Sequence, residues 1–256
     1  MGTTLTSLAA YSDDDGNSVE YAGAKAHGAI SILFAGGNNS LIVHPEARLQ
    51  KLSVRFDCNN AVLTIGANTN GRDLMLGLRL GEDASITIGD NVTTTNTVIM
   101  SAVEGASITI GRDTMIASGC QVRTDDGHPI FDVHSGRRVN VARDITVGEH
   151  VWLGGESVLL GGASIGSGSV IGYRAIVTRS IPNNVVAAGI PAKVIRKHIA
   201  WERPHLSLAK PYYKPDASTV KKSKRYWAPT REEHGRPSLR QRLSRRLRRA
   251  RGGAPT

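Results

Sequence analysis

The chain has 256 residues and a formal net charge of +10, with 28 glycines but only 3 phenylalanines, 3 tryptophans and 6 tyrosines. So few rings exclude a wide aromatic core and favour a long, narrow one built from Ile, Val, Leu and Ala. Two cysteines, Cys58 and Cys120, give no disulfide framework, and the first residues lack the basic and apolar regions of a signal peptide, so we expect a cytoplasmic protein.

After an N-terminal segment, residues 1–29, the chain repeats itself at intervals of 22 or 23 residues. The stretch ILFAGGNNSLIV from Ile32 resembles VRFDCNNAVLTI from Val54, and ASITIGD from Ala84 recurs as ASITIGR from Ala106. The Asn pairs mark turns, because Asn tolerates the left-handed backbone conformation and bonds to its own chain there. These copies predict stacked coils of one repeating unit.

The clearest repeat runs from Val147 to Thr178, where an aliphatic residue returns at every sixth position and Gly follows it in four of six hexads. A helix would need apolar residues at alternating spacings of three and four. A period of six is typical of a parallel β-helix, in which each short strand buries an aliphatic side chain and a small residue turns the corner. We therefore predict an all-β solenoid over residues 30–195, rather than a β-sandwich, which has no fixed period.

One segment, residues 128–143, breaks the period and predicts a loop that protrudes from a coil. It opens within RTDDGHPIFD, where His128 stands between acidic residues and a proline. A lone histidine in a loop is ordinarily an exposed surface residue. His134 lies in the polar run DVHSGRR and is expected to be solvated.

The run VGEHVWLGG, followed by ASIGSGSVIGYRAIVTRSIPNNVVAAGIPAKVIR, closely resembles the end of the hexapeptide-repeat acetyltransferases, which fold as left-handed parallel β-helices. Within that superfamily the chain is similar to galactoside and maltose acetyltransferases, and most of all to sugar O-acetyltransferases of capsule and lipopolysaccharide gene clusters. The shared features are the Asn-pair coils, an acidic residue before a histidine, the run GRRVNVARDITVGEHVW and a W-x-R motif. The resemblance is strongest over residues 108–203.

The resemblance implies an acetyl-CoA-dependent transferase with a saccharide acceptor, assembled as a homotrimer with each site between neighbouring solenoids. The family histidine, followed by Pro and 24 residues before a Trp, falls on His128, and its role is that of general base. Trp152 then packs beside the reacting groups, and Gly155 is the glycine whose N–H faces the thioester carbonyl. The positions that contact the coenzyme fall on Tyr173, Thr178, Arg179, Lys193 and Arg196.

Three details of this site stay open on the sequence. Family members usually carry Ala or another small residue at the position of Tyr173, so a phenol there would either narrow the coenzyme groove or stack on part of the coenzyme. Asp125 and Asp126 are equally placed to hold the imidazole tautomer, as a carboxylate does in hydrolytic triads. His150 occupies an outward-facing hexad position and is expected to line the substrate groove.

Other functions must be weighed against O-acetyl transfer. An amino sugar could accept the acetyl group by the same geometry, which would make the chain an N-acetyltransferase. Some carbonic-anhydrase-type β-helices bind zinc through three histidines, two of them five residues apart on a coil, whereas His128 and His134 are six apart inside a loop. We therefore expect no metal. A non-catalytic binding protein would have no reason to carry His128, Trp152 and Lys193 at family spacing.

The C-terminal extension, residues 196–256, carries the positive charge. Residues 201–256 contain 16 Lys and Arg against 4 Asp and Glu, which leaves residues 1–200 nearly neutral. A helix is predicted over 238–251, with three leucines on one face and seven arginines around them. Such a tail is either a disordered segment that aids solubility or an interfacial helix drawn to anionic lipid at the inner face of the membrane. Nucleic acid is disfavoured as a partner, because no recognised module is present.

Overall fold

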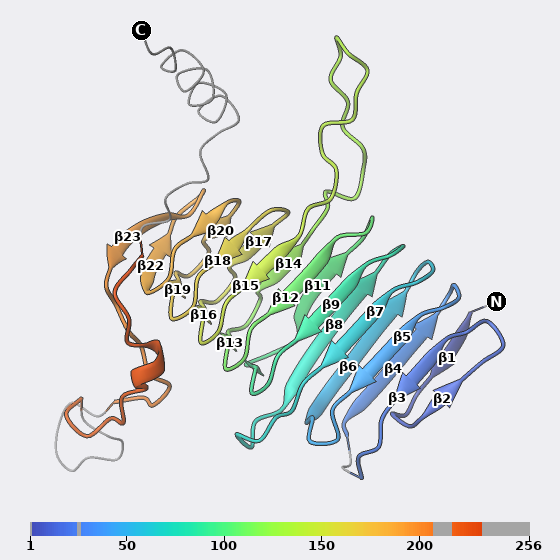
Figure 1. Cartoon of the computed structure of the whole chain (residues 1–256), viewed down its shortest axis with the longest axis horizontal. Helices are drawn as coiled ribbons and strands as arrows, with labels where there is room; N and C mark the ends of the chain where they lie inside the picture. Colours follow the sequence, from blue (N-terminus) through green and yellow to red (C-terminus); the bar gives the residue numbers. More distant parts are fainter. Residues whose placement is uncertain (1, 25–26, 207–216, 232–256) are drawn as a thin grey trace, which may run out of the picture.

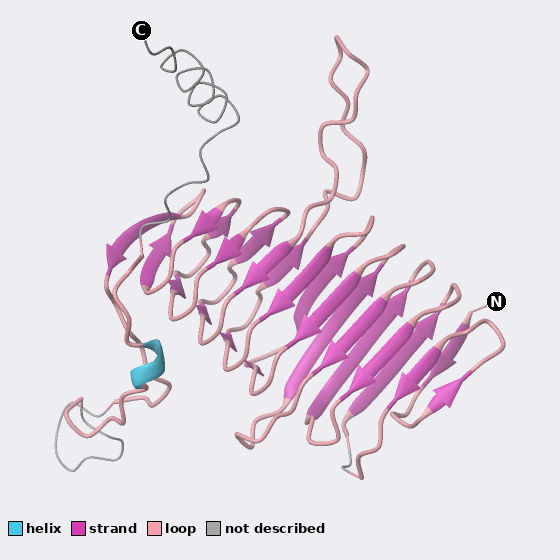
Figure 2. Cartoon of the chain, in the orientation of Figure 1, coloured by secondary structure: helices cyan, strands magenta, loops and turns pink. Residues whose placement is uncertain are grey.

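The structure, a computed structural model, describes residues 2–24, 27–206 and 217–231. Stacked coils form a three-sided prism with a β-sheet along each side, and the only helical element of these residues is a 3₁₀ turn at Lys224–Tyr226 (Figures 1 and 2). The fold class predicted from the hexads, an all-β parallel β-helix, is therefore confirmed. The predicted helix at 238–251 lies outside the described residues. Within those residues, no helix has the length and apolar character needed to cross a membrane.

The three sheets are here called faces A, B and C, in the order in which the chain visits them. Face A contains β1 (Thr3–Leu5), β4 (Ala29–Phe34), β6 (Leu49–Phe56), β8 (Leu74–Leu80), β11 (Val98–Ala102), β14 (Gln121–Arg123), β17 (Val158–Leu160) and β20 (Ile176–Val177). Face B contains β2 (Tyr11–Ser12), β3 (Ser18–Glu20), β5 (Ser40–Val43), β7 (Val62–Ile65), β9 (Ser85–Ile88), β12 (Ser107–Ile110), β15 (Ile145–Val147), β18 (Ser164–Ile165) and β21 (Ser180–Ile181). Face C contains β10 (Thr93–Thr94), β13 (Met115–Ile116), β16 (Trp152–Leu153), β19 (Val170–Ile171), β22 (Val185–Ala188) and β23 (Lys193–Lys197).

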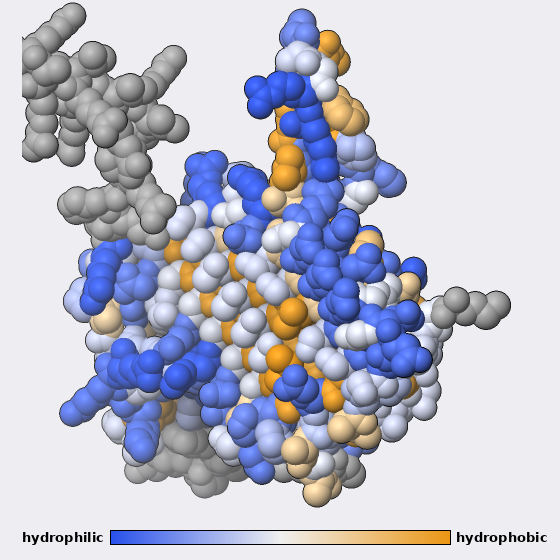
Figure 3. Space-filling view, turned by 45° about the vertical axis from the view of Figure 1, so that its right-hand side comes forward, coloured by the Kyte–Doolittle hydropathy of each residue, from blue (hydrophilic) through white to orange (hydrophobic). Residues whose placement is uncertain are grey.

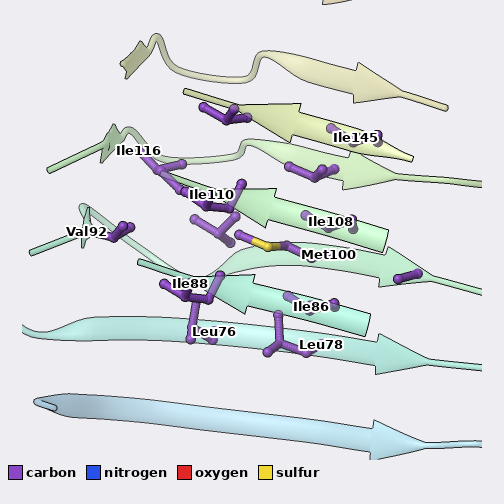
Figure 4. Packing of buried hydrophobic residues seen from close by; sticks show 14 of the residues in the cluster. Leu76, Leu78, Ile86, Ile88, Val92, Met100, Ile108, Ile110, Ile116 and Ile145 are labelled. Carbon is purple, nitrogen blue, oxygen red and sulfur yellow. The ribbon is translucent and has the colours of Figure 1, made fainter. Parts of the chain in front are cut away.

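The core is a set of aliphatic columns inside the prism (Figure 4). Ile86, Ile108 and Ile145 pair in register on face B, and each is fully buried. Because parallel strands stack about 4.8 Å apart, identical side chains on successive coils pack directly on one another. Burying each such side chain contributes about 1.5–3 kcal/mol, which explains why the aliphatic hexad position is so regular.

The corners of the coils use residues with a left-handed backbone, as the Asn pairs predict. Asn38 has φ 57° and Asn60 has φ 62°. The Asn39 side chain, next to the first of these, lies buried in the core, where its amide donates to the Asn17 side chain at 3.0 Å. We call the three rows of corners the A–B, B–C and C–A edges, after the faces that they join.

Both ends of the solenoid are covered by antiparallel strands. At the N-terminal end parallel stacking begins inside the segment 1–29, because β3 already pairs in parallel with β5. β1 then pairs antiparallel with β4, and β23 pairs antiparallel with β22 at the other end. Such strands cover the open edges that a stack of parallel coils would otherwise expose to other chains.

Candidate active site

The protruding loop, residues 124–144, is an arm that leaves the A–B edge between β14 and β15 and projects from the body (Figure 1). Its neck is closed by a hydrogen bond from the Arg143 N–H to the Thr124 carbonyl at 3.1 Å. Arg138 forms an ion pair with Glu104 at 2.9 Å, and this bond holds the pKa of Glu104 below its usual value. The arm is thus fixed to the coil below it.

His128 lies exposed near the neck of the arm, and its backbone is held by Asn140. The Asn140 amide donates to the His128 carbonyl at 2.8 Å and to the Asp126 carboxylate at 3.0 Å. Asp125 is buried and accepts from the Gly127 N–H at 2.8 Å. Both aspartates therefore shape the backbone around His128, and within the described residues neither carboxylate reaches the imidazole.

The Trp152 and Gly155 positions lie together on another part of the prism. Trp152 is on the outer side of face C, where its side chain is 39% exposed between Met115 and Val170 of the adjoining coils. Gly155 follows at the C–A edge, and no acceptor for its N–H is found among the described residues. The Gly155 N–H is free to face a substrate oxygen.

Tyr173 occupies the same corner one coil further along and covers Gly155. A Cβ atom added to Gly155 would lie 2.9–3.0 Å from two ring carbons of Tyr173, so a larger residue here would have to displace this ring. The Tyr173 hydroxyl donates to Glu156, which also accepts from the Arg174 guanidinium at 2.6 Å. The bond to Glu156 raises the pKa of Tyr173 and keeps the phenol protonated.

His128 and Gly155 cannot meet within one protomer, because they lie on different edges. Ser118 stacks on the Gly155 coil, since its carbonyl accepts from the Glu156 N–H at 2.8 Å. After the corner at Ser118 and Gly119, the chain runs along face A from Cys120 to the base of the arm at Thr124, roughly 13 Å at about 3.3 Å per residue. A complete site with both groups therefore needs the arm of a second protomer.

The coenzyme positions divide between the same two edges. Thr178 and Arg179 follow β20 at the A–B edge, on the side of the arm. Lys193 and Arg196 lie exposed on β23, with Lys193 paired to Ala188 near the C–A edge. A ligand that touches all of them must lie across two protomers or around the end of one.

His150 does not line a groove, contrary to the sequence prediction. It is 2% exposed and stacks between the rings of Trp201 and Tyr226, at centroid distances of 4.1 and 4.4 Å. One ring nitrogen lies 2.5 Å from Asp113 and the other 3.0 Å from the Trp201 carbonyl. The ring projects outward from its corner, as the hexad predicts, but the C-terminal extension covers it, so it offers no surface to a substrate.

This cluster, His150 with Asp113, Trp201, Arg203 and Tyr226, fastens the extension to the B–C edge, and we call it the clamp. Arg203 donates to Asp113 at 2.8 Å and to the Thr93 hydroxyl at 2.9 Å, so it ties together successive coils. Burial opposes ionisation of Asp113, but the bonds to His150 and Arg203 outweigh it and hold its pKa below the usual value. The W-x-R motif is therefore structural here.

Asp113→Asn is expected to loosen the clamp and destabilise the folded protein by about 1–2 kcal/mol, because charge-assisted bonds of this kind contribute that much when partly exposed. Since the pKa of Asp113 is lowered in the folded state, its contribution is present at neutral pH and is lost as pH falls below about 4. Thermal unfolding from pH 7 to pH 3 measures it, and a difference from wild type that stays constant over this range would contradict the assignment.

Neither a metal cluster nor a role for His134 emerges from the described residues. In the part of the chain that the structure covers, no three His, Cys, Asp or Glu side chains group as metal ligands would. His134 is exposed in the arm, and its backbone N–H donates to Asp132 at 3.2 Å.

Several structural residues escaped the sequence analysis. Asn140 stood inside the family-like run GRRVNVARDITVGEHVW, but nothing in its spacing shows that it bonds back to His128, twelve residues earlier. The Glu156–Tyr173 bond also joins residues 17 apart. A repeat of 18 residues per coil, which the three hexads imply, is the signal that would have brought this pair together.

Comparison with known proteins agrees with this architecture. Residues 144–179 match the family model for the bacterial transferase hexapeptide. The polysialic acid O-acetyltransferase of Neisseria meningitidis is 31% identical over 73% of this chain and 86% of its own length. That of Escherichia coli O1:K1 is 41% identical over 38% of this chain, which spans 32% of that relative. The crystal structure of the polysialic acid O-acetyltransferase OatWY superposes with a TM-score of 0.58 at 28% identity, over 69% of this chain and 81% of that one.

The period, the corner glycine and the long match to the meningococcal enzyme agree with one another. The chain belongs to the hexapeptide-repeat acetyltransferases, a family of enzymes.

Proposed function

We propose that this chain is an acetyl-CoA-dependent O-acetyltransferase that acts on a saccharide hydroxyl. The relatives named as polysialic acid O-acetyltransferases support a saccharide acceptor. The site has no resident cofactor in this proposal, and acetyl-CoA is a substrate. The exposed cations Arg179, Lys193 and Arg196 suit its phosphates, and the free N–H of Gly155 suits its thioester oxygen.

The observation that carries the proposal is the placement of His128 and Gly155 on different edges of the prism. Each site is then built from the arm of one protomer and the C–A edge of its neighbour, in a homotrimer. The arm supports this, since its exposed side chains include Ile130, Phe131, Val133 and Val139, with Val133 90% exposed (Figure 3). Apolar side chains exposed in such number are typical of a surface that contacts another chain.

The chemistry follows from these two groups. The His128 imidazole takes the proton of the acceptor hydroxyl as its oxygen attacks the thioester carbonyl, and the Gly155 N–H donates to the oxyanion that forms. When this tetrahedral species collapses, the carbon–sulfur bond breaks and the imidazolium returns its proton to the leaving thiolate. The acetyl ester, free thiol and neutral imidazole result, with no acyl-enzyme.

A direct assay tests the function. Purified full-length protein is incubated with acetyl-CoA and a saccharide, and free thiol is measured together with the mass of the sugar product. We expect thiol release that depends on the sugar, and a product heavier by one acetyl ester. A product acetylated only on an amino sugar nitrogen would assign the chain to N-acetyl transfer, and thiol release with no sugar product would refute both.

Tyr173→Ala is expected to widen the donor site beside Gly155, because the ring lies over this corner and is held there by Glu156. Relative to acetyl-CoA, kcat/KM for propionyl-CoA should rise about tenfold, the effect of room for one methylene. Tyr173→Phe keeps the ring and is the matched control. An unchanged acyl preference in the Ala variant would show that the ring does not limit the donor.

A further inference from the structure

An open pocket lies on face C, over the coils that precede Trp152, and contains none of the residues of the site described above. Its volume is about 400 Å³, and its lining comes from three successive coils. Its polar side chains include Gln50, Arg72, Asp73 and Thr94, and the apolar ones are Met75 and Met115. We call it the face C pocket. It lies where the chain between β7 and β8 takes the place of a face C strand.

The loop that carries Arg72 is held in a defined shape. The Asn91 side chain accepts from the Thr69 N–H at 2.9 Å and from the Asn70 N–H at 3.1 Å. The Asn70 side chain in turn accepts from the Arg72 N–H at 3.0 Å. The backbone on both sides of Gly71 is thus fixed before any ligand arrives, which lowers the cost of binding.

The charge of the pocket favours an anion. Asp73 forms an ion pair with Arg48 at 2.7 Å, so its carboxylate is already neutralised. The Arg72 guanidinium makes no ion pair with any described residue and is exposed. The Thr94 hydroxyl accepts from the Met75 N–H at 2.8 Å, which leaves its own hydrogen to donate. A carboxylate beside Arg72 would therefore find an unpaired, bidentate donor.

The pocket is aligned with the candidate active site. Thr93 pairs with Met115, and Met115 with Trp152, so these residues form one column on face C. At about 4.8 Å per coil, Met115 at the near wall of the pocket lies one coil from Trp152, and Thr93 lies about 10 Å from it. A ligand held there can extend along face C to the reacting groups.

We infer that the face C pocket is a subsite for an acidic sugar residue of the acceptor, with Arg72 as the cation that recognises its carboxylate. This inference rests on the proposed function, since it assigns the residue next to the one that is acetylated. The methionines Met75 and Met115 suit the apolar face of a sugar ring, and Gln50 and Thr94 suit its hydroxyls. Arg72 is then a specificity-determining residue and leaves the chemistry untouched.

Binding without acetyl-CoA tests the subsite directly. A sialic acid trimer and the neutral maltotriose are titrated calorimetrically into full-length wild type, Arg72→Gln, Arg72→Lys and Arg55→Gln. Arg55, an exposed arginine on face A bound to Asp57, is the matched control for charge loss. Arg72→Gln should weaken the acidic trimer about 10- to 100-fold, the contribution of a charge-assisted bond. Arg72→Lys should recover part of this loss, while Arg55→Gln and all maltotriose titrations should match wild type.

The transfer assay separates failure of the subsite from failure of the function. In Arg72→Gln the KM for the acidic acceptor should rise by the same factor with kcat unchanged. Acetyl transfer that is indifferent to Arg72→Gln would overturn the subsite and leave the proposed function standing. Binding of the acidic trimer that depends on Arg72, in a protein that acetylates no saccharide, would support the subsite and overturn the proposed function. Equal weakening of both sugars by Arg72→Gln would also overturn the inference, because a folding defect acts on both.

Discussion

His128→Ala is expected to lower kcat for acetyl transfer about 10²- to 10⁴-fold, the contribution of a positioned general base, equivalent to about 3–5 kcal/mol of barrier. The imidazole is exposed and makes no hydrogen bond to any described residue, so its removal should leave the fold intact. Acetyl-CoA binding and the oligomeric state should therefore match wild type. Steady-state kinetics, with calorimetric titration of acetyl-CoA, measure the two effects separately.

His134→Ala is the matched control for this experiment. His134 lies exposed in the same arm, six residues away, and is not attached to the neck. Its variant should keep wild-type kcat. A His128→Ala variant with more than a tenth of wild-type activity would exclude His128 as the base, and equal losses in both variants would point to the arm as a whole.

The prism itself could be predicted from the sequence because its interactions repeat. Val147, Leu153 and Leu159 are each buried, as the aliphatic hexad position predicts. The reason is local, because each strand of this stretch, from β15 to β21, is two or three residues long and buries only one or two side chains. The backbone conformation of the corners could also be predicted from residue type. Asn38 and Asn60 have the positive φ that asparagine tolerates.

Contacts between segments far apart in the chain could not be predicted in this way. His150 is correctly placed at an outward corner, but Trp201 and Tyr226, 51 and 76 residues later, cover it. The extension that carries them has no period, so nothing in the sequence fixes where it lies. The prediction that Asp125 or Asp126 orients the imidazole of His128 was missed for a related reason. Asp126 accepts a hydrogen bond from the Asn140 amide, and Asp125 accepts one from the Gly127 N–H.

Trimers that contain both the His128→Ala and the Gly155→Val variant are expected to be active, although trimers of either variant alone are not. This is the strongest consequence of a site divided between two edges. His128→Ala removes the base from the arm. Gly155→Val places a side chain against the Tyr173 ring and disturbs the oxyanion donor. Loss of such a donor lowers kcat about 10²- to 10³-fold. Either variant alone should be nearly inactive, because every site in its trimer contains the same defect.

Co-expression of the two variants in equal amounts, with different affinity tags, produces mixed trimers in which some sites are intact. A site is intact when a Gly155→Val protomer supplies the arm and a His128→Ala protomer supplies the C–A edge, so random assembly into closed trimers should restore about a quarter of wild-type activity. Gly155→Val with Trp152→Ala is the control pair: both residues come from the same protomer's side of the site, so mixing them should restore nothing. If the first pair also stays inactive in trimers that carry both tags, His128 and Gly155 do not reach one site from two different protomers, because assembly is then complete and only the site shared between protomers is missing.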